Sequence, residues 1–242
     1  MEITTLSSGS QAGNCHMVFD GKTRVLLDVG ISFKKLTESL HKRGLTTNEI
    51  AGILITHEHG DHVKGARGAV KGAMDVYTSM GTATHRNVNI SGHRVHIVKS
   101  MDTFAVGTFD CLAFDVIHNV VEPLCFCLTS QITSERVMYI TDTMVVKYRV
   151  PNVTHWLIEC DYDEESLALS VKNGYTNEKL AGRIRANHMS LATVKQFLAD
   201  NDLSQTKRIH LIHLSNTRAY ADYMKAEVKK AAPGIEVTVA GR

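Results

Sequence analysis

Three histidines and Asp61 lie within a stretch of six residues, shortly after an apolar run. Segment 53–62 reads ILITHEHGDH. His57 and His59 project to the same side of an extended chain, and a glycine turn returns Asp61 and His62 from the first turn of a helix. Four ligand groups can therefore converge on two adjacent positions. Imidazole and carboxylate without a nearby thiolate suit Zn²⁺ or Mn²⁺ in an open catalytic site rather than in a closed structural site.

The chain is also rich in histidine. There are 13 histidines in 242 residues, a high fraction for a protein. The 27 Lys and Arg against 25 Asp and Glu leave a net charge of +2. That charge is too small to indicate a nucleic-acid-binding protein, although it does not exclude one with clustered basic residues. A chain of this length can build a core without disulfides or metal.

Export and membrane insertion are not expected. No apolar run approaches the roughly 18 residues of a membrane span, and the N-terminal residues MEITT lack the basic and apolar regions of a signal peptide. We therefore expect a cytoplasmic protein with no membrane partner. The cysteines are odd in number and lack paired spacing, so we expect them to be reduced and mostly buried. They are Cys15, Cys111, Cys125, Cys127 and Cys160.

Hydrophobic periodicity predicts an α/β chain with one domain, residues 1–242, and two central sheets. The predicted strands are Ile3–Leu6, Cys15–Phe19, Arg24–Asp28, Gly52–Ile55, His93–Lys99, Thr103–Val106, Phe109–Ile117, Leu124–Ser130, Arg136–Ile140, Trp156–Cys160, Arg208–His213 and Glu236–Val239. The predicted helices are Phe33–Arg43, Asp61–Gly72, Asp163–Val171, Thr176–Ala186, Ser190–Asp200, with Ser190 as its cap, and Thr217–Ala231. Strands in runs with helices packed outside favour an α/β sandwich over a Rossmann fold, and no glycine-rich motif indicates a nucleotide-binding loop.

The motif at residues 57–62 resembles that of the metallo-β-lactamase superfamily, and the resemblance covers essentially the whole chain. It implies a four-layer αβ/βα sandwich and a centre with two divalent metal ions, zinc or manganese, with iron also acceptable. The implied ligands lie at strand ends and are His57, His59 and His118 for one metal, Asp61, His62 and His213 for the other, and Asp142 between them. Asp28 would hold the metal-binding loop through hydrogen bonds without binding metal itself. His210 competes with His213 but faces the other side of its strand.

Within the superfamily, the chain looks most like the YycJ/WalJ group of nuclease-like metallohydrolases, and more distantly like RNase Z and PhnP phosphodiesterases. The segments that carry this resemblance are SSGSQAGNC at 7–15, LLDVGIS at 26–32 and Thr141-Asp142. Two motifs depart from the group. Residues 159–163 read ECDYD where the group has ESNHD, and residues 188–191 read HMSL where it has HLSN. The departures affect expected substrate preference, whereas the metal ligands are unaffected.

Glu159 and His188 resemble the Glu and His that RNase Z-type phosphodiesterases use as an acid pair. A leaving alkoxide needs a proton, and a histidine kept cationic by a carboxylate can supply it. The alternative is a partly exposed loop histidine beside a helix cap. Asp61 is expected to be catalytic as well as a ligand, because with Asp142 it would orient the attacking water.

Substrate contacts are predicted from polar and basic residues near these motifs. Asn14 and Ser215 could contact phosphate, while Ser10 is better explained as a turn residue. Lys64, Arg67 and Lys71 would share one face of the helix after the metal motif, although a solvated helix face explains such charges equally well. Further basic candidates are Lys34, Lys35, Lys179, Arg183 and Arg185.

The leading hypothesis is a phosphodiesterase with two metals that acts on nucleic acid, as a DNA nuclease of exonuclease type. The alternatives are a hydrolase of small cyclic nucleotides or cyclic sugar phosphates, a thioester hydrolase of glyoxalase II type, and a scaffold without activity. The partner is accordingly nucleic acid or a small phosphodiester. The sequence leaves open whether the chain forms a homodimer.

Overall fold

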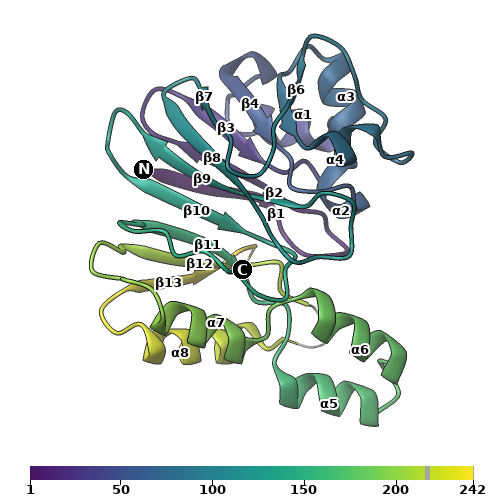
Figure 1. The fold of residues 1–242 in the computed structure, drawn as a ribbon, viewed down its shortest axis with the longest axis vertical. Helices are drawn as coiled ribbons and strands as arrows, with labels where there is room; N and C mark the ends of the chain where they lie inside the picture. Colours follow the sequence, from purple (N-terminus) through teal and green to yellow (C-terminus); the bar gives the residue numbers. More distant parts are fainter. Residues whose placement is uncertain (216–218, 242) are drawn as a thin grey trace. The chain divides into compact units, whose positions relative to one another are not determined.

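The structure is a computed structural model that describes residues 1–215 and 219–241. The chain divides into two compact units. Figure 1 labels the helices and strands. Unit 1 comprises Met1–Asp115, Val120–Glu135 and Gly241, and unit 2 comprises Val116–Asn119 and Arg136–Ala240. The single domain expected over residues 1–242 stays a prediction.

Unit 1 is built on a six-stranded sheet whose strands follow chain order. Its strands are β1 (Glu2–Ser7), β2 (Cys15–Phe19), β3 (Arg24–Leu27), β4 (Ile50–Leu54), β5 (Val76–Thr78) and β6 (Val95–Ile97). The first three strands pair antiparallel, and β3 to β6 pair parallel. An antiparallel meander follows, made of β7 (Thr103–Val106), β8 (Phe109–Asp115) and β9 (Leu124–Ser130).

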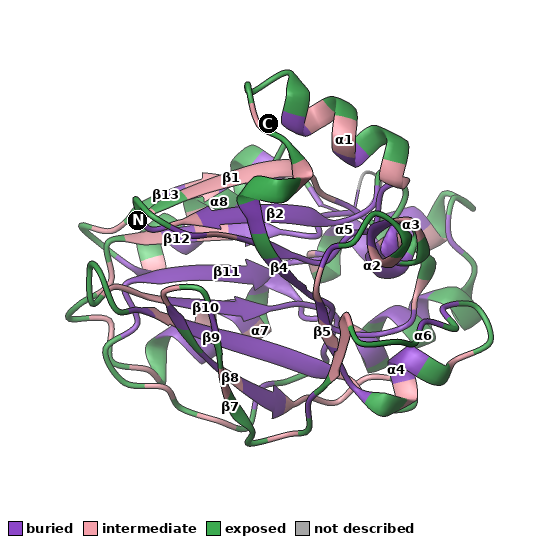
Figure 2. Ribbon diagram, turned by 90° about the horizontal axis from the view of Figure 1, so that it is seen from above, coloured by how far each residue is buried: buried purple, intermediate pink, exposed green. Residues whose placement is uncertain are grey.

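The helices of unit 1 bury apolar stripes in a shared core. They are α1 (Phe33–His41), the 3₁₀ helix Thr47–Glu49, α2 (Gly60–Val63), α3 (Ala66–Lys71) and α4 (Met80–Thr84). Ser32 caps α1, and Leu36 and Leu40 lie at i and i+4, so both face the core while the opposite side of the helix is exposed (Figure 2).

Unit 2 contains a parallel sheet, and its helices follow the strands. The strands are β10 (Arg136–Ile140), β11 (His155–Glu159), β12 (Arg208–Ile212) and β13 (Glu236–Val239). The helices are α5 (Glu164–Lys172), α6 (Glu178–Asn187), α7 (Leu191–Ala199) and α8 (Ala221–Ala231). Every residue of β11 is buried, as expected for a central parallel strand. Ser190 caps α7 by accepting a hydrogen bond from the Thr193 amide, which confirms the predicted cap.

One predicted helix is wrong because a tertiary contact interrupts it. The expected helix Asp61–Gly72 is two helices, with Lys64 and Gly65 between them. The Gly65 amide donates to the carbonyl of Val29, and a Cβ at Gly65 would lie 2.6 Å from the carbonyl oxygen of Ile31. The chain therefore packs against the preceding turn at this point instead of continuing the helix.

Other differences concern short elements and element ends. Strand β5 and helix α4 were not predicted, because each has too few residues to show a clear period. The predicted start of the last helix, Thr217, lies outside the described residues, and α8 begins at Ala221. All five cysteines are buried and outside disulfides, as predicted. Among the described residues, no helix has the length and apolar character needed to cross a membrane.

Candidate metal centre

In unit 1, strand β4 positions the histidine motif. The strand is apolar and buried, and it ends at Leu54, so the loop Thr56–His59 leaves the carboxyl end of the sheet. His59 then has extended backbone torsions as the first flanking residue of α2, which turns the chain and places Asp61 and His62 in the first turn of this helix. The residues 57–62 therefore form one compact loop around a strand end, as the pattern predicts.

The three imidazoles of this loop lie against one another. His57 Nε2 is 3.1 Å from His59 Nδ1, and the ring centroids of His57 and His62 are 4.2 Å apart. His62 Nε2 lies 3.5 Å from a carboxylate oxygen of Asp61. His57 and His62 are buried, whereas His59 and Asp61 are partly exposed. Ring nitrogens that lie this close to one another and to a carboxylate suit a metal-binding loop.

Two residues behind the loop orient these rings. The Asp28 carboxylate accepts a hydrogen bond of 2.7 Å from His62 Nδ1 and one of 2.8 Å from the Thr56 amide. The Thr56 hydroxyl lies 3.0 Å from His57 Nδ1 and also contacts the Asp28 carboxylate. The Nδ1 atoms of His57 and His62 are thus occupied, so Nε2 is the nitrogen that each ring would offer to a metal. The contribution of Thr56 was missed, because a threonine at a strand end has no distinctive sequence signal.

The Asp28 turn is packed tightly against α2. Asp28 has a left-handed backbone with φ of 57°, and Gly30 follows two residues later. A Cβ at Gly30 would lie only 1.7 Å from the carbonyl oxygen of Asp61, so glycine is required for this close approach. The Val29 amide donates to the carbonyl of His62. Backbone contacts therefore fix the distance between the Asp28 turn and the histidine loop.

In unit 2, three strand ends place a second group of side chains. Glu159 is the last residue of β11, His213 follows β12, and Asp142 lies two residues after β10. Because these strands are parallel, their carboxyl ends share one edge of the sheet. Asp142 and His213 have left-handed backbones, with φ of 45° and 55°. Strain of this kind costs about 1–3 kcal/mol per residue and is typical of functional sites.

Two imidazoles converge on the buried carboxylate of Asp142. His118 Nε2 lies 3.7 Å from Asp142 Oδ2, and His213 Nε2 lies 3.5 Å from Asp142 Oδ1. His118 Nδ1 faces the carbonyl of Asn187 at 3.2 Å. Each oxygen of one carboxylate therefore faces a different imidazole. His210 does not join this group, and its Nδ1 lies 2.5 Å from the hydroxyl of Thr238.

Glu159 and His188 form a tight pair beside this carboxylate. His188 Nδ1 donates to Glu159 Oε1 at 2.6 Å, and His213 Nδ1 lies 3.2 Å from the same oxygen. The other Glu159 oxygen accepts hydrogen bonds from the amides of Thr143 and Met189. Glu159 thus orients both His188 and His213.

The pair shifts the pKa of each partner toward the charged form. Burial opposes ionisation of Glu159, but the charge of His188 and hydrogen bonds from His188 and His213 outweigh it, so the pKa of Glu159 is lowered. Burial also disfavours the His188 cation, yet the charge and hydrogen bond of Glu159 raise the pKa of His188 to about 9. His188 is therefore cationic at neutral pH, with a fifth of its side chain exposed.

The predicted substrate residues do not all have the same surroundings. Asn14 is buried, with its amide nitrogen 3.1 Å from His62 Nε2, and Ser215 is buried at the start of the segment after β12. Lys64 and Arg183 are exposed. Arg67 donates from Nε to the carbonyl of Val88 and from a terminal nitrogen to that of Arg86. Some of its N–H groups are therefore engaged by backbone carbonyls.

Unit 1 contains a polar pocket beside Asp61. Its volume is about 760 Å³, and its lining includes the cationic side chains Lys35, Lys64 and Arg67 together with Ser10. Lys71 does not line it. The expectation that Lys64, Arg67 and Lys71 share one face of a single helix is wrong, because Lys64 lies between α2 and α3, whereas Arg67 and Lys71 belong to α3. A pocket with three cations next to a candidate ligand is suited to phosphate.

The donor atoms of both units suit a divalent metal. In each unit, imidazole nitrogens and carboxylate oxygens converge, and their far sides are held by carboxylate, hydroxyl or carbonyl groups. Within unit 2, donor atoms of Asp142, Glu159, His188 and His213 lie within 4.8 Å of one another. All five cysteines are buried and outside disulfides, and burial raises the pKa of Cys15, Cys111 and Cys160, which disfavours thiolate ligands.

Comparison with known proteins identifies the family. Residues 23–214 match the family model of the beta-lactamase superfamily domain. The chain is 31% identical over 229 residues to the exodeoxyribonuclease YycJ of Bacillus anthracis, which covers 89% of this chain and 83% of that protein. It is also 31% identical to the exodeoxyribonuclease WalJ of Streptococcus pneumoniae, over 88% of this chain and 81% of that protein.

Solved structures agree on the fold. The metallo-β-lactamase fold protein YhfI of Bacillus subtilis matches with a TM-score of 0.72 and 15% identity, over 98% of this chain and 95% of that one. Human tRNase Z, short form, matches with a TM-score of 0.61 and 16% identity, over 99% of this chain and 96% of that one. A diphosphatase of the PhnP family matches with a TM-score of 0.65 and 16% identity, over 98% of this chain and 93% of that one. The predicted α/β fold class is confirmed, and the chain belongs to the metallo-β-lactamase superfamily, as a metal-dependent hydrolase of the group that contains YycJ and WalJ.

Proposed function

We propose that this protein is a phosphodiesterase that uses two divalent metal ions to hydrolyse nucleic acid, as a DNA exonuclease. The observation that carries the proposal is the pair of His188 and buried Glu159 at 2.6 Å, on the sheet edge that also presents Asp142 and His213. Cleavage of a phosphodiester expels an alkoxide, which must be protonated as it leaves. The names of the two relatives at 31% identity support DNA as the substrate.

The proposed metal ligands follow the family pattern. One metal would be held by His57, His59 and His118, the other by Asp61, His62 and His213, and Asp142 would contact both. Divalent ions in such a site supply Lewis acidity, which lowers the pKa of water and offsets negative charge on phosphate oxygens. The expected content is two metals per chain, and less than about one per chain would contradict the proposal.

The side chains of this chain have separate tasks in the reaction. Asp61 and Asp142 accept hydrogen bonds from the attacking water and orient it toward phosphorus. Glu159 keeps His188 protonated and directs its Nε2 away from the carboxylate. His188 then donates its Nε2 proton to the departing oxygen and recovers a proton from solvent, to which it is partly exposed.

A substrate comparison tests this function. The metal-loaded protein should hydrolyse linear DNA and bis(p-nitrophenyl) phosphate, and His59→Ala should lose both activities because a proposed ligand is missing. RNA, a cyclic nucleotide and a thioester in the same assay test the alternatives. A clear preference for the cyclic nucleotide or for the thioester would overturn the assignment of nucleic acid as substrate.

The polar pocket beside Asp61 should contribute to nucleic-acid affinity. Replacing Lys35 and Lys64 with glutamine removes two of the cations that line it. We expect weaker binding of DNA and a slope of log affinity against log salt that is smaller by roughly one for each lysine. Titrations of labelled DNA between about 50 and 200 mM salt measure both quantities.

Lys71→Gln is the matched control for this prediction. Lys71 belongs to the last turn of α3 and is exposed, but it does not line the pocket. Its salt slope should therefore stay close to that of the unmodified protein. Equal losses in Lys71→Gln and in the double variant would mean that general positive charge, and not this pocket, attracts the DNA.

A further inference from the structure

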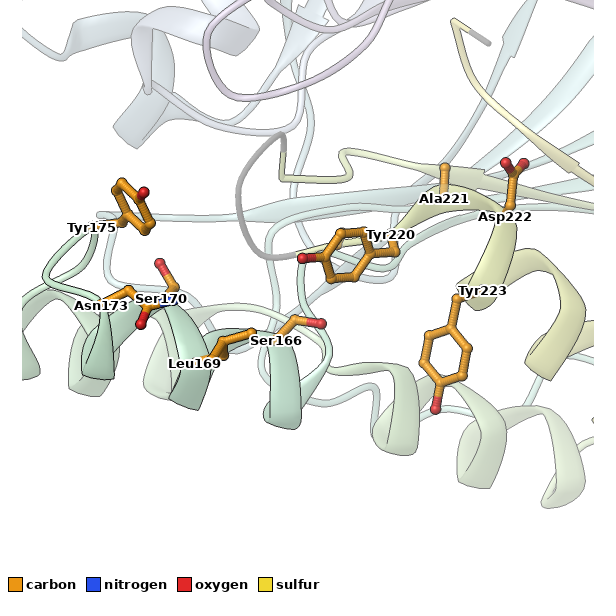
Figure 3. A pocket seen from close by; sticks show the side chains of 10 residues that line it. Ser166, Leu169, Ser170, Asn173, Tyr175, Tyr220, Ala221, Asp222 and Tyr223 are labelled. Atoms are coloured by element: carbon orange, nitrogen blue, oxygen red, sulfur yellow. The ribbon is translucent and has the colours of Figure 1, made fainter.

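Unit 2 contains a second pocket, formed by α5, the segment after it and the start of α8 (Figure 3). Its volume is about 860 Å³, within the range of ligand-binding sites. Tyr175, Tyr220 and Tyr223 all line it and are 80%, 64% and 46% exposed. They are the exposed tyrosines among the described residues. Tyrosine side chains are therefore concentrated on the surface at this one place.

The remaining lining restricts the chemistry of the occupant. Leu169, which is 48% exposed, forms the floor with Ser166 and Ser170 on α5. Among the described residues that line this pocket, Asp222 is the charged one, and none is Lys, Arg or His. A phosphate group would gain no charge pairing there and would be repelled by the carboxylate. A flat, uncharged group that offers both a ring face and polar edges fits the lining better.

The two tyrosines that flank the floor come from separate segments. Tyr175 follows the end of α5, and Tyr220 precedes α8 and extends toward α5 (Figure 3). Tyr223 lies on another side of α8 and also lines a neighbouring pocket. Tyr175 and Tyr220 therefore offer ring faces on both sides of a floor of leucine and serine, an arrangement suited to stacking.

The pocket is connected to the catalytic edge of the parallel sheet. Helix α5 begins five residues after Glu159, and Tyr220 follows His213 along the chain. The Ser215 amide donates to the carbonyl of Asp161 at 3.0 Å, which joins the two segments where they leave β11 and β12. The two segments that form the pocket, α5 and the start of α8, thus follow the strand ends that carry Glu159 and His213.

We propose that this pocket binds unpaired bases of the polynucleotide substrate by stacking them on Tyr175 and Tyr220. Aromatic stacking tolerates any base, because every base has a π-face, whereas the phosphates stay outside, away from Asp222. The inference rests on the proposed function and narrows it. The substrate is a single-stranded end or strand, held by its bases at a place separate from the scissile phosphate.

Binding of charge-matched oligonucleotides tests the proposal. The probes are a fluorescein-labelled oligothymidylate of about 12 nucleotides and an abasic strand of the same length and charge, titrated into the full chain in EDTA so that neither is cleaved. The unmodified protein should bind the oligothymidylate more tightly. Tyr175→Ala with Tyr220→Ala should weaken oligothymidylate binding by about 10- to 100-fold and leave abasic binding unchanged.

Conservative and matched variants separate stacking from damage to the fold. Tyr175→Phe with Tyr220→Phe keeps both rings and should bind like the unmodified protein. Leu180→Ala removes an exposed apolar side chain from neighbouring α6, outside the pocket, and should also have no effect. Equal binding of the two probes by the unmodified protein would overturn the proposal, as would unchanged binding in the double alanine variant.

The same protein preparation distinguishes this inference from the proposed function. Bis(p-nitrophenyl) phosphate contains no nucleobase, so its hydrolysis by the metal-loaded unmodified protein reports on phosphodiesterase activity alone. If that activity is present and the tyrosine variants bind oligothymidylate normally, only the base-binding pocket is wrong. If the activity is absent, the proposed function fails, while the titrations still decide whether the pocket binds bases.

Discussion

Replacing His188 with alanine should lower kcat for DNA cleavage by about 10²–10⁴-fold and leave bound metal unchanged. His188 is held by Glu159 through Nδ1, so its Nε2 is available to donate a proton to the leaving oxygen. His188 is not one of the seven proposed ligands, and its ring stacks on that of His213 with the centroids 5.5 Å apart. Metal analysis of the purified variant must accompany the kinetics.

The leaving group distinguishes proton donation from a general disturbance of the site. The p-nitrophenolate ion is stable without protonation, whereas the alkoxide that leaves a DNA strand is not. His188→Ala should therefore affect bis(p-nitrophenyl) phosphate much less than DNA. Equal losses on both substrates, or loss of metal from the variant, would contradict a role as general acid.

The pH dependence of kcat gives an independent test of the same pair. His188 is charged below its pKa of about 9 and neutral above it, so activity that needs its proton falls as the pH rises through that value. Bound metal cations lower this pKa, which places the basic limb at or below pH 9. Glu159→Gln removes the charge that stabilises the cation, and the limb should then move to lower pH by roughly 1–3 units. If the basic limb of kcat stays at the same pH in Glu159→Gln, a group other than His188 must cause it.

The sequence was most informative where side chains are placed by strand ends. His57, Asp142 and His213 each follow a buried strand closely, and the apolar pattern of these strands is clear enough to locate them to within a residue or two. Since the carboxyl ends of parallel strands share an edge, the approximate location of each group could be predicted before its contacts were known.

Features that depend on packing between distant segments could not be predicted. The break at Gly65 follows from its contact with the carbonyls of Val29 and Ile31, more than thirty residues earlier in the chain. The placement of Tyr175 and Tyr220 in the lining of one pocket is of the same kind, because an isolated surface tyrosine has no sequence signal that distinguishes it from any other. Local periodicity contains no information about such contacts.

Replacing Asp28 with asparagine should weaken metal binding by about 10- to 100-fold while leaving the fold largely intact. Asparagine has nearly the same shape and tolerates the left-handed backbone at this position, where φ is 57°. The native carboxylate accepts from the Thr56 amide through one oxygen and from His62 Nδ1 through the other. An asparagine has one acceptor oxygen, so one of these two contacts must face its NH₂ group.

The Thr56 amide cannot change its role, whereas an imidazole can. The asparagine oxygen should therefore face Thr56 and its NH₂ should face His62, which forces Nδ1 of His62 to become the acceptor. The proton then resides on Nε2, the nitrogen that the geometry leaves for the metal, and it must be displaced before the metal can bind. Competition with a chelator measures the affinity, and NMR of the histidine ring nitrogens in the metal-free protein reports the tautomer.

Asp20→Asn is the matched control. Asp20 is also a buried carboxylate, but its hydrogen-bond donors are the amides of Lys22 and Thr23 and the hydroxyls of Thr108 and Ser130, which lie outside the histidine loop. It should lower the thermal midpoint without changing metal affinity, so that an equal loss of affinity in both variants would contradict the tautomer argument and point to general destabilisation of unit 1.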